Sequence, residues 1–154
     1  MITLPSYKID GVVIKQCKEL GFSEVYIAEE FEGEECDRIP DVDCVYITEG
    51  NTFEIANYIR KNDFDKYIQK QVIQNKVTYI GSSAGAIYAA SNFKEAVNFD
   101  SNYIGMTSFK GLMLMPHENG FGVTVLPHYT YKQAQTYISN VNEVDKSLYS
   151  KVVK

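Results

Sequence analysis

The residues most able to do chemistry lie in the run Gly81-Ser82-Ser83-Ala84-Gly85. A Gly-x-Ser-x-Gly pattern between an apolar strand and a helix-forming segment is typical of a nucleophile elbow, a sharp turn that presents a serine hydroxyl. The two glycines leave room for neighbouring backbone where a Cβ atom would clash. The pattern therefore predicts Ser83 as a nucleophile, although an ordinary strand-to-helix turn can carry the same five residues.

A serine hydroxyl is a weak nucleophile at neutral pH and needs an imidazole to accept its proton. The chain has two histidines, His117 and His128. We favour His128, because it follows an expected strand directly and so lies at the same sheet edge as Ser83. His117 lies in a Pro-His-Glu-Asn-Gly loop whose direction the sequence does not fix. The alternative for His128 is a structural histidine at the end of a strand.

A serine hydrolase also needs backbone donors for the oxyanion of its tetrahedral intermediate. The amide of Ala84 follows the nucleophile at the positive end of the next helix. The second donor must come from another loop at the strand ends, and Gly50 is the obvious candidate. Gly50 could equally be a turn glycine before a helix that Asn51 or Thr52 caps.

Short apolar strands alternate with helices along the chain. The expected strands are Ile2–Leu4, Glu24–Ala28, Cys44–Ile47, Val77–Ile80 and Gly122–Leu126. The expected helices lie between Ile9 and Leu20, in two pieces from Phe53 to Val72 with a break near Asn62 and Asp63, from Ala84 to Ser91, and from Tyr131 to about Val141. The βαβαβα order predicts a three-layer α/β fold, a mostly parallel sheet with helices on both faces.

The composition predicts one soluble domain that covers the whole chain. The 154 residues are 45% hydrophobic, enough for one core, and the net charge of -5 leaves no basic surface for nucleic acid. No apolar run approaches the about 20 residues that cross a bilayer, and no signal peptide is evident, so we expect a cytoplasmic protein without membrane contact. The sequence leaves the oligomeric state open.

The cysteines Cys17, Cys36 and Cys44 are odd in number and lack CxxC spacing. They predict neither a disulfide framework nor a metal site, and we expect no cofactor. A cysteine hydrolase with a histidine base is conceivable. None of the three cysteines, however, lies at a turn like the one around Ser83.

Three separated motifs, in register, resemble the peptidase E and cyanophycinase family of serine peptidases. They are Glu49-Gly50-Asn51-Thr52-Phe53, the run from Tyr79 to Ala86, and Leu126-Pro127-His128-Tyr129. Members of this family have a Gly-Gly-Asn-Thr loop, a Gly-x-Ser-Ala-Gly elbow and a Pro-His-Tyr or Pro-His-Phe segment in this order. The resemblance implies a class I glutamine amidotransferase-like, flavodoxin-like architecture. It also implies Ser83 as nucleophile, His128 as general base, and Gly50 and Ala84 as oxyanion donors.

The chain departs from the family pattern in two ways. Glu49 replaces the first glycine of the Gly-Gly-Asn loop, which puts a carboxylate near an anionic intermediate. The resemblance also implies that this single domain, residues 1–154, lacks the first strand and the C-terminal strand of the family, and with the latter the usual acidic residue of the triad. Asp100 is the candidate substitute, ahead of Glu143 and Asp145.

The sequence therefore predicts a serine-type hydrolase that cleaves a small peptide or isopeptide bond through an acyl-enzyme on Ser83. One alternative is a shortened family member that keeps the fold as a binding module without catalysis. Another is an α/β-hydrolase esterase, for which the 45 positions between Ser83 and His128 are few. Neither Arg38 nor Arg60 is obviously at the strand ends, so a lysine could equally recognise an acidic substrate.

Overall fold

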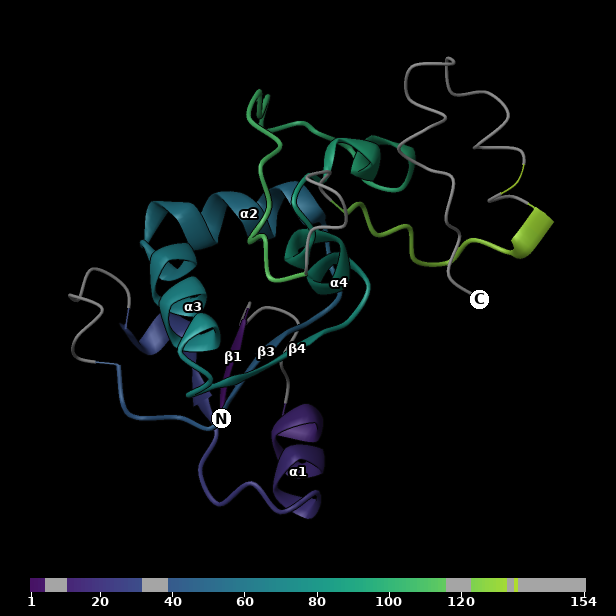
Figure 1. The fold of residues 1–154 in the computed structure, drawn as a ribbon. Coiled ribbons are helices and arrows are strands. Elements are labelled where there is room, and N and C mark those ends of the chain that lie inside the picture. Colours follow the sequence, from purple (N-terminus) through teal and green to yellow (C-terminus); the bar gives the residue numbers. More distant parts are fainter. Residues whose placement is uncertain (5–10, 32–38, 116–122, 133–134, 136–154) are drawn as a thin grey trace.

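A parallel sheet forms the centre of the protein (Figure 1). The computed structural model describes residues 1–4, 11–31, 39–115, 123–132 and 135. Within them the strands are β1 (Ile2–Leu4), β2 (Tyr26–Ile27), β3 (Cys44–Ile47) and β4 (Thr78–Gly81), in the spatial order β2-β1-β3-β4. Every neighbouring pair is parallel. The predicted α/β class with a parallel sheet is confirmed.

The register of the strands brings three carboxyl ends into one row. Leu4 pairs with Ile47, and Ile47 pairs with Gly81. The loops that follow β3 and β4 therefore leave the sheet side by side. In open parallel sheets this edge is where ligands bind.

Helices cover both faces of the sheet, as the sequence predicts. Val45 and Ile47 of β3 are fully buried in a core that includes Ile59 of α2 (Thr52–Lys61) and Ile68 of α3 (Phe64–Ile73). Cys44 packs in a separate cluster with Cys17 of α1 (Gly11–Glu19). Because successive side chains of a strand point to opposite faces, α1 lies across the sheet from α2 and α3, and Figure 1 shows these three layers.

The break between α2 and α3 lies where the sequence predicts it. Asn62 ends α2, and its backbone N–H bonds to the carbonyl of Tyr58 at 3.2 Å. Asp63 then takes a left-handed conformation, with φ at 56°, before α3 begins at Phe64. Asparagine and aspartate tolerate this conformation better than other residues with side chains, which is why a polar pair marks the turn.

Several predicted boundaries are wrong. The strand expected over Glu24–Ala28 shrinks to β2, because Ala28 begins a 3-10 helix, η2 (Ala28–Phe31). The helix expected from Ala84 to Ser91 is α4 (Ala84–Ala89). It ends two residues early, because Ala90 is extended, with ψ at 174°. Residues 123–126 form no strand: the carbonyl of Val123 accepts a hydrogen bond from Ser91, after α4. Of the helix expected from Tyr131, residues 131, 132 and 135 are helical and the rest lies outside the described residues.

The described part of the chain contains no helix with both the length and the apolar character needed to cross a membrane. The longest described helices, α2 and α3, have 10 residues each. About 20 residues would be needed to span a bilayer.

Candidate active site

Ser83 lies at a sharply strained turn between β4 and α4. Its φ is 47° and its ψ is -105°, a conformation that residues with a side chain rarely adopt. Such a backbone costs about 1 to 3 kcal/mol and persists only where the surroundings impose it. Here the Ser82 amide donates to the Ile47 carbonyl at 2.9 Å, and the Gly85 amide donates to the Thr48 carbonyl at 3.2 Å. The end of β3 thus holds both sides of the elbow.

The two elbow glycines are required by close backbone approach. A Cβ atom on Gly81 would lie 2.7 Å from the carbonyl carbon and oxygen of Gly85. A Cβ atom on Gly85 would lie 2.2 Å from the carbonyl oxygen of Ile47. Non-bonded carbon and oxygen atoms cannot approach this closely. The spacing that marked the motif in the sequence is therefore the spacing of two contact points around Ser83.

His128 faces Ser83 across the strand ends. The Oγ atom of Ser83 lies 2.9 Å from Nε2 of His128, a hydrogen-bond distance. His128 has φ at 67° and follows Pro127 in a turn, so the segment bends at this point. Ser83 is half-buried and His128 is exposed. A base in contact with the serine hydroxyl, and open to solvent, is what nucleophilic attack and hydrolysis need.

The two predicted oxyanion donors come from adjacent loops. Gly50, with φ at 148°, precedes Asn51, whose side-chain oxygen caps α2 by accepting from the amides of Phe53 (2.9 Å) and Glu54 (3.2 Å). Ala84 is the first residue of α4. Among the described residues, the amides of Gly50 and Ala84 have no protein acceptor. Amides in such positions can donate to a substrate oxygen.

Asp100 is bonded to Thr52, the first residue of α2. One carboxylate oxygen accepts hydrogen bonds from the backbone amide of Thr52 at 2.8 Å and from its hydroxyl at 2.6 Å. In the described chain the hydrogen-bond partner of His128 is Ser83, not Asp100. The geometry thus joins Asp100 to α2 rather than to the base. The other acidic candidates, Glu143 and Asp145, lie outside the described residues, as does His117.

The segment around Asp100 contacts both halves of the site. The side-chain amide of Asn51 donates to the carbonyl of Ser101 at 2.9 Å. The ring of Phe99 meets the ring of Tyr129, next to His128, edge to face at a centroid distance of 5.4 Å. Sequence reasoning missed this bridge between the Gly50 loop and the His128 turn. The signal that could have found it was an acidic residue after η4 (Lys94–Asn98), beside an aromatic one.

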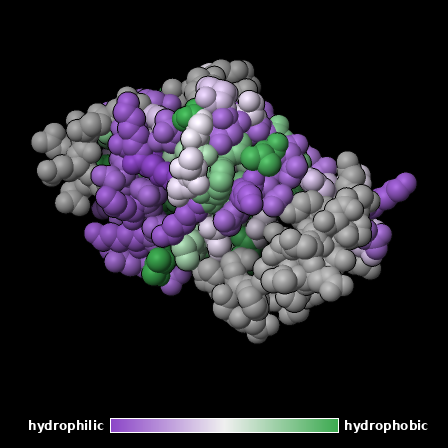
Figure 2. All heavy atoms as spheres, turned by 90° about the horizontal axis from the view of Figure 1, so that it is seen from above, coloured by the Kyte–Doolittle hydropathy of each residue, from purple (hydrophilic) through white to green (hydrophobic). Residues whose placement is uncertain are grey.

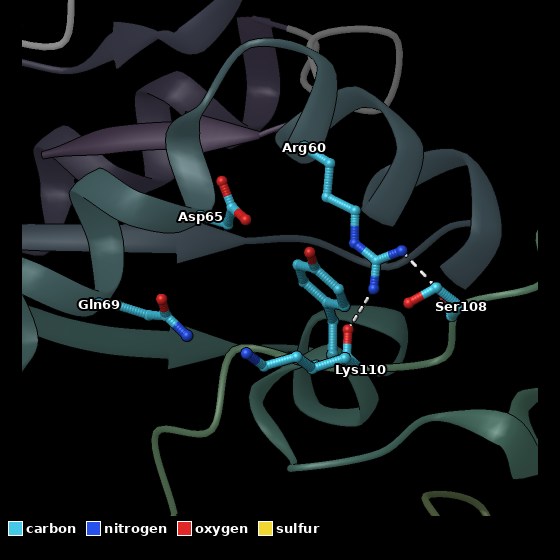
Figure 3. Close-up of a pocket in the computed structure, with 7 residues that line it drawn as sticks. Arg60, Asp65, Gln69, Ser108 and Lys110 are labelled. Atoms are coloured by element: carbon cyan, nitrogen blue, oxygen red, sulfur yellow. Dashed lines mark hydrogen bonds between the residues drawn. The ribbon is translucent and has the colours of Figure 1, made fainter.

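A separate hollow of about 210 Å³ lies beside α2 and α3, and its lining includes neither Ser83 nor His128 (Figure 3). Arg60 donates there to the carbonyls of Ser108, at 2.9 Å, and Lys110. Its guanidinium also lies 5.4 Å from the centre of the Phe93 ring. These contacts attach segment 108–110 to α2, so Arg60 has a structural role. Arg38 lies outside the described residues.

A parallel sheet with a nucleophile elbow at its strand ends occurs in several α/β folds. This protein has the class I glutamine amidotransferase-like fold, as the solved structure described below shows. The chain belongs to peptidase family S51, because the sequence model of that family matches residues 13–150. The resemblance to peptidase E that the three motifs carry is therefore confirmed.

The chain is similar to two bacterial relatives and to one solved structure. An uncharacterized peptidase of Listeria monocytogenes is 31% identical over 119 residues, which are 75% of this chain and 55% of the relative. One of Listeria innocua is 32% identical over 89 residues, or 56% of this chain and 39% of the relative. A crystal structure of a Listeria monocytogenes protein assigned as a peptidase E has a TM-score of 0.63 at 20% identity, covering 90% of this chain and 73% of that one. The chain spans about half the length of the curated relatives it matches.

Proposed function

We propose that this protein is a serine-type peptidase that cleaves a small peptide or isopeptide bond through an acyl-enzyme on Ser83. The observation that carries the proposal is the 2.9 Å contact between Ser83 Oγ and His128 Nε2 at a strained elbow. Membership of peptidase family S51 supports the reaction class. A strained turn that holds a serine against a histidine has a stability cost, and catalysis would account for it.

The proposed first step is acylation. His128 Nε2 takes the hydroxyl proton as Ser83 Oγ bonds to the substrate carbonyl carbon, and the carbonyl oxygen becomes an oxyanion. The amides of Gly50 and Ala84 donate to that oxygen; removal of one such donor typically costs about 100- to 1,000-fold in rate. The tetrahedral intermediate then loses its amine, which receives the proton from His128.

The second step is deacylation. His128 accepts a proton from water as the water oxygen attacks the ester carbonyl of acylated Ser83. Collapse of the second intermediate breaks the ester bond, and His128 returns the proton to Ser83 Oγ. The products are a carboxylic acid and free enzyme. An orienting acid on Nδ1 of His128 would increase the rate by fixing the tautomer, but attack itself needs the base and the two amides.

The test is labelling by a fluorophosphonate, which phosphonylates an activated serine, read by intact mass. We expect the unmodified chain to gain one label, and Ser83→Ala to gain none. His128→Ala should abolish labelling, while His117→Ala should not. Failure of the unmodified chain to label would contradict the proposal and favour a binding module without catalysis. Equal labelling of Ser83→Ala would place the nucleophile elsewhere.

Labelling does not separate a peptidase from an esterase, so product analysis completes the test. The chain is incubated with a mixture of short peptides and with 4-nitrophenyl esters, and products are read by mass spectrometry. New amino termini that require Ser83 support a peptidase. Ester hydrolysis without any peptide cleavage would support the esterase alternative.

A further inference from the structure

We propose that the hollow beside α2 and α3 binds a small zwitterion, of the class of free α-amino acids, at a site separate from Ser83. The hollow has a volume of about 210 Å³, and Asp65, Gln69 and Lys110 are among the residues that line it. Drug-sized ligands occupy pockets of about 300 to 1,000 Å³, so this one suits a molecule the size of a single amino acid. The inference is independent of the proposed function, because none of these three residues takes part in the proposed reaction.

The α3 side of the hollow offers hydrogen-bond acceptors. Asp65 and Gln69 lie four positions apart on α3, and therefore on one face of the helix. One oxygen of the Asp65 carboxylate, Oδ1, is buried without a hydrogen-bond partner among the described residues. Gln69 Nε2 donates to the carbonyl of Leu112 at 2.8 Å, which leaves its side-chain oxygen as an acceptor. Because an unpartnered buried carboxylate oxygen is unfavourable, a ligand ammonium group is stabilised on this side.

The opposite side of the hollow offers a positive charge. Lys110 is exposed, and within the described part of the chain its ammonium group makes no ion pair. Figure 3 shows the Asp65 carboxylate and the Lys110 ammonium group on opposite sides of the hollow. A ligand carboxylate is attracted to the Lys110 side.

The charges on the two sides select the class of ligand. A simple anion would face the carboxylate of Asp65, and a simple cation would face the ammonium group of Lys110, and like charges repel each other. A zwitterion that places its ammonium group toward α3 and its carboxylate toward Lys110 satisfies both sides. Most residues that line the hollow are polar or charged, which does not suit an apolar ligand. The face of the molecule in Figure 2 is likewise mostly hydrophilic, with apolar residues scattered over it.

Contacts within the protein hold the shape of the hollow. Arg60 of α2 donates to the carbonyls of Ser108 and Lys110. A Cβ atom on Gly111 would lie 2.1 Å from the carbonyl oxygen of Ala90, so the backbone here packs directly on the residue that follows α4. Because these contacts fix the wall that carries Lys110, little of the backbone has to be ordered when a ligand binds.

The experiment is isothermal titration calorimetry of the unmodified chain with glycine, L-alanine, L-leucine and L-aspartate. We expect at least one of them to bind one site per chain with a Kd of about 1 mM or tighter. The C-terminal amide and the N-acetyl form of the tightest amino acid each lack one charge and should bind about tenfold more weakly or worse. Failure of all four to bind, or equal binding of either single-charge analogue, overturns the inference.

Variants locate the binding in the hollow. Asp65→Asn and Lys110→Met should each weaken the binding about tenfold or more. The matched controls are Asp41→Asn and Lys70→Met, at exposed positions outside the lining, and both should bind like the unmodified chain. Ser83→Ala should also keep the affinity. Unchanged affinity in Asp65→Asn and Lys110→Met, or its loss in Ser83→Ala, would place the amino acid elsewhere and overturn the inference.

An ion pair between Lys110 and Asp65 is the competing explanation for the two charges. In that case the unmodified chain binds none of the four amino acids, and Lys110→Met gains affinity for ethylamine, which then takes the place of the lysine ammonium group. This combination would overturn the inference.

Fluorophosphonate labelling separates this inference from the proposed function. Asp65→Asn and Lys110→Met should label at the rate of the unmodified chain, which also shows that the elbow is intact in both variants. A chain that takes the label on Ser83 but binds no amino acid keeps the function and loses this site. A chain that binds the amino acid but takes no label keeps this site and loses the function.

Discussion

Asp100 and Thr52 form a paired hydrogen bond although 48 positions separate them in the chain. A single carboxylate oxygen accepts from both the amide, at 2.8 Å, and the hydroxyl, at 2.6 Å, of Thr52. Thr52 is fully buried and begins α2, directly after Gly50 and Asn51. A carboxylate at a helix N-terminus also interacts favourably with the helix dipole. Asp100 is therefore placed to fix the position of the oxyanion loop.

Loss of this carboxylate should weaken both the fold and the site. We expect Asp100→Ala to lower the free energy of unfolding by about 1.5 to 3 kcal/mol, because the buried amide and hydroxyl of Thr52 lose a charged partner. Fluorophosphonate labelling should slow by about tenfold or more, because the Gly50 loop is released. Urea denaturation and labelling kinetics give the two values.

A variant of Thr52 distinguishes a positioning role of Asp100 from a role as the acid of a catalytic triad. If Asp100 acts through Thr52, then Thr52→Val should also slow labelling, but by less than Asp100→Ala, because valine loses the hydroxyl and keeps the backbone amide. The double variant should be no slower than Asp100→Ala alone. If Asp100 orients His128 instead, Thr52→Val should label at nearly the rate of the unmodified chain. That result would restore Asp100 as the candidate acid.

The elbow glycine Gly85 should tolerate no side chain. The Cβ atom of an alanine at this position would lie 2.2 Å from the Ile47 carbonyl oxygen. Overpacking typically costs about 1 to 3 kcal/mol. We expect Gly85→Ala to reach about 3 kcal/mol, the upper end of that range, or to fail to fold. The matched control is Gly11→Ala at the start of α1, where a Cβ meets nothing within 4 Å. Thermal unfolding compares them; equal melting temperatures would contradict the close approach in the elbow.

The hydroxyl of Tyr79 should stabilise the elbow through a hydrogen bond to Gly85. It donates to the Gly85 carbonyl at 2.6 Å, and burial raises the pKa of this tyrosine well above its ordinary value, so the hydroxyl stays a donor. Tyr79→Phe should cost about 1 kcal/mol, the usual net value of such a bond. Tyr103→Phe, at a residue that is 66% exposed, is the control and should change little. Denaturant midpoints measure both; a neutral Tyr79→Phe would show that the bond contributes nothing.

The sequence predicts the parts of this molecule that local patterns encode. The apolar runs at Cys44 and Val77 predict strands, and the glycines around Ser83 predict the elbow because each has a steric reason. Local patterns fail where a tertiary contact decides. The expected strand 122–126 is absent over 123–126, since Val123 bonds to Ser91 instead.

The candidate site divides in the same way. The sequence pairs Ser83 with His128 because each follows an expected strand and parallel strands end at one edge. The two side chains do meet, at 2.9 Å, although residues 123–126 before His128 form no strand. The role of Asp100 could not, because its partner Thr52 is distant in the sequence and the pairing depends on how segment 99–102 folds over α2. The acidic side chain of Asp100 makes it a candidate in the sequence, and only the fold shows that it binds Thr52.

Tyr88 should make the protein less stable in alkali. It is 1% exposed and packs against Phe93, and burial raises its pKa to about 12 from an ordinary value of 10.0. Between these values the unfolded chain loses the phenolic proton while the folded chain keeps it, so the free energy of unfolding falls as pH rises. Well below pH 10, the ordinary value of tyrosine, the contribution is fully present. The shift corresponds to about 2 kcal/mol lost by pH 12.

Other groups also titrate in this range, so the measurement is a difference between variants. The free energy of unfolding is determined from pH 9 to 12 for the unmodified chain, Tyr88→Phe and the exposed control Tyr103→Phe. Tyr88→Phe should be equally or less stable than the unmodified chain at pH 9, and should lose about 2 kcal/mol less by pH 12, because phenylalanine has no proton to lose. Tyr103→Phe should follow the unmodified chain. Parallel curves for all three proteins would show that the Tyr88 hydroxyl ionises as readily in the folded chain as in the unfolded one.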